Sequence, residues 1–125
     1  MCYEAEQYVS PGGKKPVLEF MMEHDKETQD WIIAGIMLLE KNKGRLTGQN
    51  LETKHIRNKI FELKFKKLAI RILFAYHPLK RKFVLLLHGL IKKRDDLKSS
   101  DIKIAEDRYN EVIKRGNEGE KYEKN

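Results

Sequence analysis

Four side chains in one basic stretch of the sequence could act on a phosphate ester: Glu62, Lys64, Arg71 and His88. Arginine stays protonated near neutral pH, so Arg71 is suited to stabilising phosphate charge and unsuited to removing a proton. Lys64 could play a similar role, or could act as a base. Histidine can carry protons near neutral pH, so His88 could be a general acid. Its apolar neighbours in the sequence fit a hydrogen-bonded core histidine equally well.

Glu62 is the only acid between residues 54 and 94. It could orient a base, but pairing with a neighbouring lysine or arginine is the interpretation we favour. His55 and His77 are weaker candidates and are expected at the surface. No group of His, Asp and Glu residues has the spacing of a metal site, so we expect a metal-free route with no cofactor.

Positive charge is concentrated in the same stretch. The chain carries a net charge of +7, and residues 54–94 hold thirteen Lys or Arg residues against one acid. Such a block attracts polyanions. Because its basic residues alternate with strand-forming residues, we expect contact with nucleic acid, with a solvated basic surface as the alternative. The candidate RNA contacts are Lys54, Arg57, Lys66, Lys67, Lys92, Lys93 and Arg94.

Length and composition bound the class of protein. The 125 residues are enough for one domain, predicted over 1–117, with a disordered tail over 118–125. No apolar run reaches the roughly 18 residues of a membrane span, and the N-terminal residues do not resemble a secretion signal. Cys2 is the only cysteine, which excludes internal disulfides and Cys-based zinc sites. These features favour a cytoplasmic location.

The hydrophobic pattern predicts an α+β fold in the order β-α-α-β-β-β-α. Strands are expected over 3–9, 55–65, 68–76 and 83–91, helices from Pro16, from the N-cap Asp25 and from Ser99 or Ser100, and a loop over 46–53. We expect an antiparallel sheet of about four strands with all helices on one face. The partly open second face would carry Lys64 and Arg71. Core positions are expected at Trp31, Ile32, Ile36 and Leu39, although this stripe could instead form a groove for a partner helix.

Several segments, in the correct order, resemble the HigB-type toxins of the phage-derived group. Residues 3–8 and 13–20 resemble the family's N-terminus. Phe61-Glu62-Leu63-Lys64 is similar to its Glu-Leu-Arg strand, and residues 69–74 are similar to its Arg-Ile/Val strand. The run Leu86-Leu87-His88-Gly89-Leu90 and the two lysines that follow Ile91 resemble its most recognisable signature. The last helix, with Asp101, Ala105 and Arg108, follows the same pattern.

This resemblance implies a RelE/ParE-like fold and the toxin of a type II toxin–antitoxin pair, usually a ribosome-dependent mRNA endoribonuclease with a helix-turn-helix, HigA-like antitoxin. Two positions depart from the pattern. Lys64 stands where the family has arginine, which keeps the charge but loses the planar fork. Acidic residues 95 and 96 stand in a stretch that is normally Thr-Gln-Lys-Thr-Pro. The shared fold leaves two rivals: a ParE-like toxin that binds a topoisomerase, and a nucleic-acid-binding module without catalysis.

Overall fold

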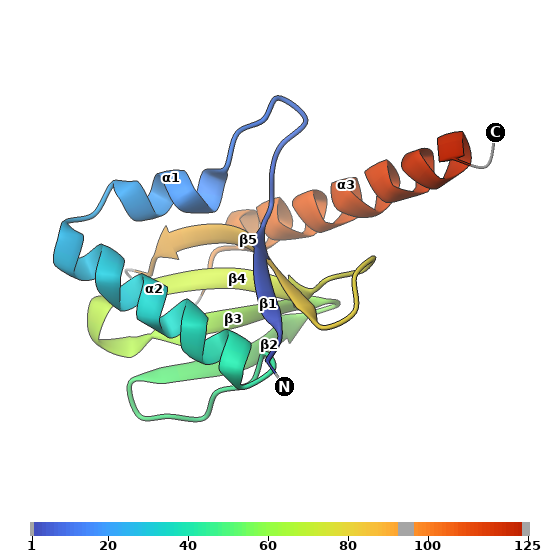
Figure 1. Ribbon diagram of the computed structural model, residues 1–125. Coiled ribbons are helices and arrows are strands. Elements are labelled where there is room, and N and C mark those ends of the chain that lie inside the picture. Colours follow the sequence, from blue (N-terminus) through green and yellow to red (C-terminus); the bar gives the residue numbers. More distant parts are fainter. Residues whose placement is uncertain (1, 93–96, 124–125) are drawn as a thin grey trace.

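The computed structural model describes residues 2–92 and 97–123 (Figure 1). The chain forms eight main elements in the order β-α-α-β-β-β-β-α. The strands are β1 (Glu4–Gln7), β2 (Leu51–Arg57), β3 (Ile60–Phe65), β4 (Ile70–Tyr76) and β5 (Phe83–Ile91). The helices are α1 (Pro16–Met22), α2 (Lys26–Lys41) and α3 (Ser99–Glu123), and a single 3₁₀ turn, η1 (Lys66–Leu68), joins β3 to β4.

The five strands form one sheet in the order β1-β5-β4-β3-β2. Strands β2 to β5 pair antiparallel, as expected. The first strand, β1, pairs with the β5 edge in parallel, so the expectation of a wholly antiparallel sheet was wrong. The strand count was wrong, because the predicted strand 55–65 and part of the predicted loop are in fact two strands. Asn58, with a φ of 51°, turns the chain between Arg57 and Ile60. Asparagine tolerates this left-handed conformation, so the hairpin needs neither glycine nor proline.

The predicted helix ends are confirmed at both N-terminal helices. Pro16 opens α1, where its missing N–H costs no hydrogen bond. The Oδ1 atom of Asp25 accepts a hydrogen bond of 2.8 Å from the backbone N–H of Thr28 at the start of α2. Beyond the end of α2, Gly44 adopts a φ of 85° and its N–H donates to the carbonyl of Leu39. These hydrogen bonds define the two ends of α2.

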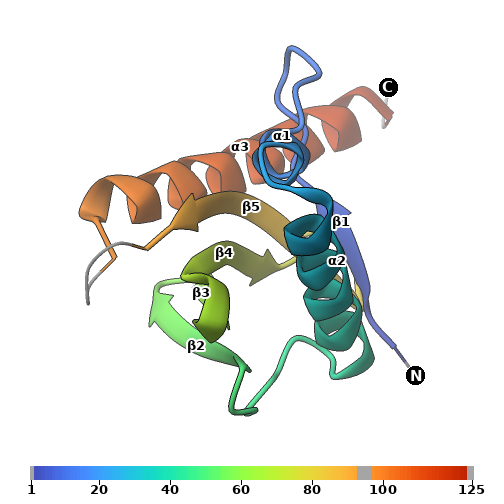
Figure 2. The same ribbon diagram turned by 90° about the vertical axis from the view of Figure 1, so that its left-hand side faces the viewer.

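The helices cover both faces of the sheet, not one as expected. Helices α1 and α2 lie on one face and α3 lies on the other (Figure 2). The reason is visible in β4 and β5, whose residues Leu73, Ala75, Leu85 and Leu87 point away from α2 and are fully buried beneath α3. Strands that are apolar on both faces need a covering layer on each.

Two further features of the helices qualify the predictions. Ile32 and Leu39 are buried in the α2 core as expected, but Trp31 is 60% exposed, so its core assignment was wrong. The helical backbone of α3 continues past Glu118, where the sequence predicts a tail, to Glu123. Within the described ranges, none of the helices combines the length and the apolar character that crossing a membrane requires.

Candidate functional site

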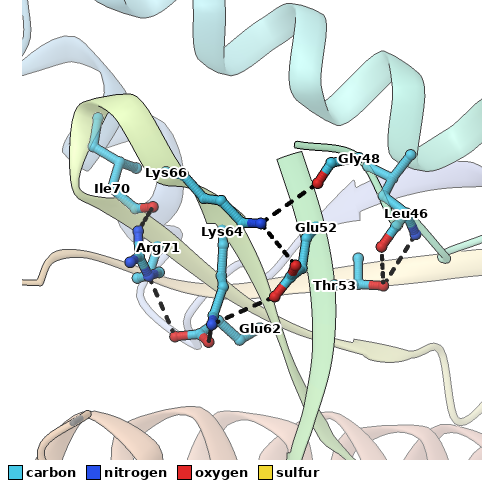
Figure 3. Close-up of polar contacts among 9 residues, drawn as sticks. All are labelled: Leu46, Gly48, Glu52, Thr53, Glu62, Lys64, Lys66, Ile70 and Arg71. Atoms are coloured by element: carbon cyan, nitrogen blue, oxygen red, sulfur yellow. Dashed lines mark hydrogen bonds and ion pairs between the residues drawn. The ribbon is translucent and has the colours of Figure 1, made fainter. Parts of the chain in front are cut away.

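Three of the four candidate catalytic residues share one patch on the α3 face of the sheet. Lys64 on β3 lies directly opposite Arg71 on β4, and Glu62 lies two residues further along β3 on the same face, opposite Leu73. The strand alternation therefore placed Arg71 correctly, on the face opposite Ile70 and Ile72. Figure 3 shows the result, with the carboxylate of Glu62 between the cationic ends of Lys64 and Arg71.

Glu62 is a buried counter-ion for both cations. Only 1% of the residue is exposed. Its Oε1 lies 4.0 Å from the Nζ of Lys64, and its Oε2 lies 3.6 Å from the Nε of Arg71. Glu62 therefore pairs with neighbouring cations, which is the interpretation that the sequence favoured. A carboxylate so deeply buried contacts its two neighbours and does not present itself to a ligand at the surface.

Arg71 and Lys64 are less open than the sequence suggested. Their side chains are 12% and 18% exposed, and the face that was expected to be partly open also carries α3, packed on β4 and β5. The NH1 group of Arg71 donates a hydrogen bond of 3.0 Å to the carbonyl of Ile70. Both cations are therefore mostly buried, and each is paired with the carboxylate of Glu62.

Sequence reasoning missed Glu52, which extends this cluster onto β2. Its carboxylate lies 3.6 Å from the Nζ of Lys64 and 2.8 Å from the Nζ of Lys66 (Figure 3). The hydrogen bond from Lys66, together with the positive charges of both lysines, lowers the pKa of Glu52 below its ordinary value. Assigning residues 46–53 to a loop hid this contact, since only strand pairing brings Glu52 opposite Lys64.

His88 does not join the cluster. It lies in the same row as Glu62, but the buried Leu73 of β4 separates the two. Its Nε2 is 2.8 Å from the Oδ1 of Asp101, and its Nδ1 is 3.4 Å from the NH1 of Arg108. A neutral ring that donates from Nε2 and accepts at Nδ1 satisfies both contacts. Asp101 and Arg108 are seven residues apart on α3, and that two-turn spacing is the signal that could have assigned them this role.

The candidate RNA contacts are spread over several parts of the surface. Lys54 is exposed on the same face as Glu62, directly opposite it in register. Arg57 lies at the β2–β3 hairpin, where its NH2 is 2.7 Å from Glu106 of α3, and this hydrogen bond raises the pKa of Arg57. Lys66 is bound to Glu52, as described above, whereas Lys67 borders a groove beside α2.

Of the three remaining candidates, only Lys92, just after β5, lies among the described residues. The backbone N–H of Lys92 donates to the carbonyl of Ala69, which anchors this strand end beside η1. Lys93 and Arg94 lie outside the described residues. Strand register therefore brings Lys54 close to the cluster and the ion pair with Glu52 does so for Lys66, whereas Arg57 and Lys67 lie elsewhere.

The weaker histidine candidates differ from each other. His55 is exposed, as expected, and its Nε2 is 2.7 Å from the carbonyl of Asn58. His77 was expected at the surface, but its side chain is buried, with Nε2 2.8 Å from the Oε2 of Glu6. In the part of the chain that the structure describes, no three His, Cys, Asp or Glu side chains gather closely enough to hold a metal ion.

The sequence matches the model of a known protein family. The model of the family described as phage-derived protein Gp49-like (DUF891) matches residues 19–110, a region from α1 to the middle of α3 that contains all the candidate residues. No curated protein matches the chain. Since the family model spans most of the sequence, the chain belongs to the phage-derived Gp49-like family, a family of RelE-like toxins.

Proposed function

We propose that this protein is the toxin of a type II toxin–antitoxin pair, of HigB type, that cleaves mRNA on the ribosome in the cytoplasm. Its antitoxin would be a HigA-like helix-turn-helix protein. One observation carries the proposal: Lys64 and Arg71 lie side by side over the buried carboxylate of Glu62. Two further observations support it. The pair lies in a segment, residues 54–94, that holds thirteen basic residues, and the chain belongs to a RelE-like toxin family.

The arrangement suits stabilisation of a phosphorane. In metal-free RNA cleavage the 2′-oxygen loses its proton and bonds to phosphorus, and the bond to the 5′-oxygen breaks as that oxygen gains a proton. The pentavalent intermediate carries extra negative charge, which prepositioned cations stabilise. Arg71 offers a planar guanidinium and Lys64 a point charge. Glu62 holds both side chains in place, so that little reorganisation is needed when the charge develops.

The contacts of His88 favour a second candidate. Both ring nitrogens already have partners, Asp101 and Arg108. To donate a proton to the leaving oxygen, the ring would first have to release one of them. A toxin that binds a topoisomerase, or a nucleic-acid-binding module without catalysis, needs no such release. These alternatives predict that transcripts stay intact.

Inducible expression with mapping of transcript 5′ ends separates the two candidates. New ends confined to translated messages would support the nuclease, and inhibited supercoiling with intact transcripts would support the topoisomerase-binding toxin. In the nuclease, Arg71→Ala should lower the cleavage rate roughly 10²–10³-fold, as removal of one transition-state donor does. Arg71→Lys should recover part of this loss. Lys103→Ala, an exposed position on α3, is the matched control and should cleave at the wild-type rate.

Antitoxin dependence provides an independent check on the toxin assignment. A toxin should stop growth when expressed alone, and co-expression of a neighbouring helix-turn-helix protein should restore growth. Harmless overexpression of the chain alone would contradict the proposal for every kind of toxin, whether or not it cleaves RNA.

A further inference from the structure

Helix α2 carries an apolar stripe that its own chain leaves exposed. Five exposed residues follow one another at alternating spacings of four and three along the helix: Glu27, Trp31, Ala34, Leu38 and Lys41. We name these five residues the α2 seam. Such spacing keeps side chains on one face of a helix and is typical of helices that pack against another helix. The buried residues of α2, Ile32, Gly35 and Leu39, lie beside the seam and face the sheet.

Apolar grooves flank the seam on both sides. One, with a volume of about 220 Å³, lies between α2 and the chain around Phe65 and Leu68. The other lies between α2 and the start of β1, next to Met37. Ala34 and Leu38 line both grooves and so form the ridge between them. A ridge with an apolar groove on each side can interdigitate with a second ridge of the same shape.

The charges of the seam are arranged symmetrically about its centre. Glu27 and Lys41 each lie seven residues from Ala34, which is about 10.5 Å along the helix axis in opposite directions. Neither has an ion-pair partner among the described residues. The seam therefore has an unpaired acid at one end, an unpaired base at the other, and its smallest side chain in the middle.

We propose that two copies of this chain associate through the α2 seam, with the helices antiparallel and a two-fold axis near Ala34. Glu27 of each copy then lies level with Lys41 of the other, and Trp31 lies level with Met37 and beside Leu38 of the other. A parallel arrangement would place like charges together at both ends. Self-complementarity of this kind is what a two-fold symmetric interface requires, and a different partner would have no need of it. This argument favours a second copy as the occupant.

Dimerisation through α2 leaves the Lys64–Arg71 cluster accessible. In Figure 3, α2 lies on one side of the strands and Glu62 faces the α3 side. The two clusters of the dimer would thus face away from the interface. Self-association does not depend on whether the chain cleaves RNA, so the two proposals can fail separately.

Charge reversal tests the seam directly. Sedimentation equilibrium at low salt, from about 1 μM to about 1 mM, should show a monomer–dimer equilibrium for the wild-type chain. Glu27→Lys alone and Lys41→Glu alone should each weaken the dimer about tenfold, because two exposed attractive pairs become two repulsive ones. The double variant Glu27→Lys with Lys41→Glu restores opposite charges in both pairs and should return to within about twofold of the wild type.

Apolar variants complete the test. Trp31→Ala should weaken the dimer more than tenfold, as truncation of a central interface aromatic does. Met22→Ala on α1 is the matched control, because Met22 is 64% exposed, close to the 60% of Trp31, but lies off the seam. Circular dichroism should be unchanged in all variants. A chain that is monomeric up to about 1 mM, or a double variant as weak as the single ones, would overturn the proposal.

Discussion

Arg71 and Glu62 approach each other across β3 and β4 without hydrogen bonding. The Nε of Arg71 lies 3.6 Å from the Oε2 of Glu62, and both atoms are buried with no hydrogen-bond partner in the described residues. Their interaction is therefore one of charge, in a poorly solvated place where charge matters more than at the surface. Removing either member leaves the other buried with less compensation.

Arg71→Ala should consequently lower the free energy of unfolding by about 2 kcal/mol, because it leaves the buried Glu62 with Lys64 alone. For a side chain on an open face, the expected loss would be smaller, within about 1 kcal/mol. Urea unfolding measures the difference. Lys54→Ala, an exposed cation on the same face, is the control and should change stability by less than about 0.5 kcal/mol. Equal losses in the two variants would show that the pair has no energetic role.

The His88–Asp101 contact should hold the first turn of α3 against β5. Asp101→Ala removes the acceptor 2.8 Å from Nε2 and should cost about 1 kcal/mol of stability. Asp101→Asn keeps an acceptor oxygen and should cost less. Hydrogen exchange should quicken in this turn of the helix first. If exchange there is the same in the wild type and Asp101→Ala, His88 does not anchor α3.

Acid should loosen the β2–β3 hairpin from α3. Hydrogen bonds from Arg57 and Asn58 lower the pKa of Glu106 from its ordinary value of 4.5. A carboxyl whose pKa is lower in the folded state contributes stability above its unfolded pKa, and this contribution disappears as the pH falls through the folded value. The unfolding free energy of the wild type should therefore decline more steeply below about pH 4.5 than that of Glu106→Gln. Parallel declines would contradict this.

Gly35→Ala should destabilise the protein although alanine is the better helix former. A Cβ at this position would lie 2.6 Å from the Cζ of Phe65, whose ring is buried in the core. Alanine gains about 1 kcal/mol of helix propensity. Overpacking costs about 1–3 kcal/mol. Thermal unfolding should show a net loss, whereas Ile33→Ala, exposed on the same helix, should stay near the wild type. A higher melting temperature for Gly35→Ala would mean that Phe65 moves aside freely.

If the basic face binds RNA, its affinity should fall steeply as salt rises. Each phosphate contact with single-stranded RNA contributes about 0.7 to the slope of log affinity against log salt. Lys54→Gln should lower the slope by about that amount. Lys66→Gln should have a smaller effect, because Lys66 already pairs with Glu52 at 2.8 Å. Lys15→Gln, at the start of α1, is the control. A slope near zero for the wild type would exclude phosphate contacts.

Local signals predicted most of the elements that position the candidate site. Strand β5 matches the predicted range, and Pro16 and Asp25 mark helix starts because their backbone chemistry acts within one turn. The β2–β3 hairpin was missed because Asn58 is a weak turn signal between two segments that both favour strands. Periodicity cannot divide a strand-forming run when the turn contains neither glycine nor proline.

The features that the sequence did not predict depend on contacts between distant segments, which no local pattern indicates. The apolar pattern of β5 indicated that both of its faces are buried, but not that α3 would cover the second one. The partners of Glu62 could be inferred because alternate residues of β3 and β4 face the same side of the sheet. The partners of His88 could not be inferred in this way, because Asp101 and Arg108 belong to α3, which is a separate element that contacts β5 only in the folded chain.

The parallel pairing of β1 with β5 has a consequence for synthesis. Glu4 pairs with Phe83, so β1 cannot join the sheet until β5, the last strand, has been synthesised. The β2–β3 and β3–β4 hairpins can close as they emerge, because their contacts are local, whereas closing the β1–β5 contact spans most of the chain and is slow. A nascent chain stalled before β5 therefore holds Lys64 and Arg71 on paired strands but has no completed sheet.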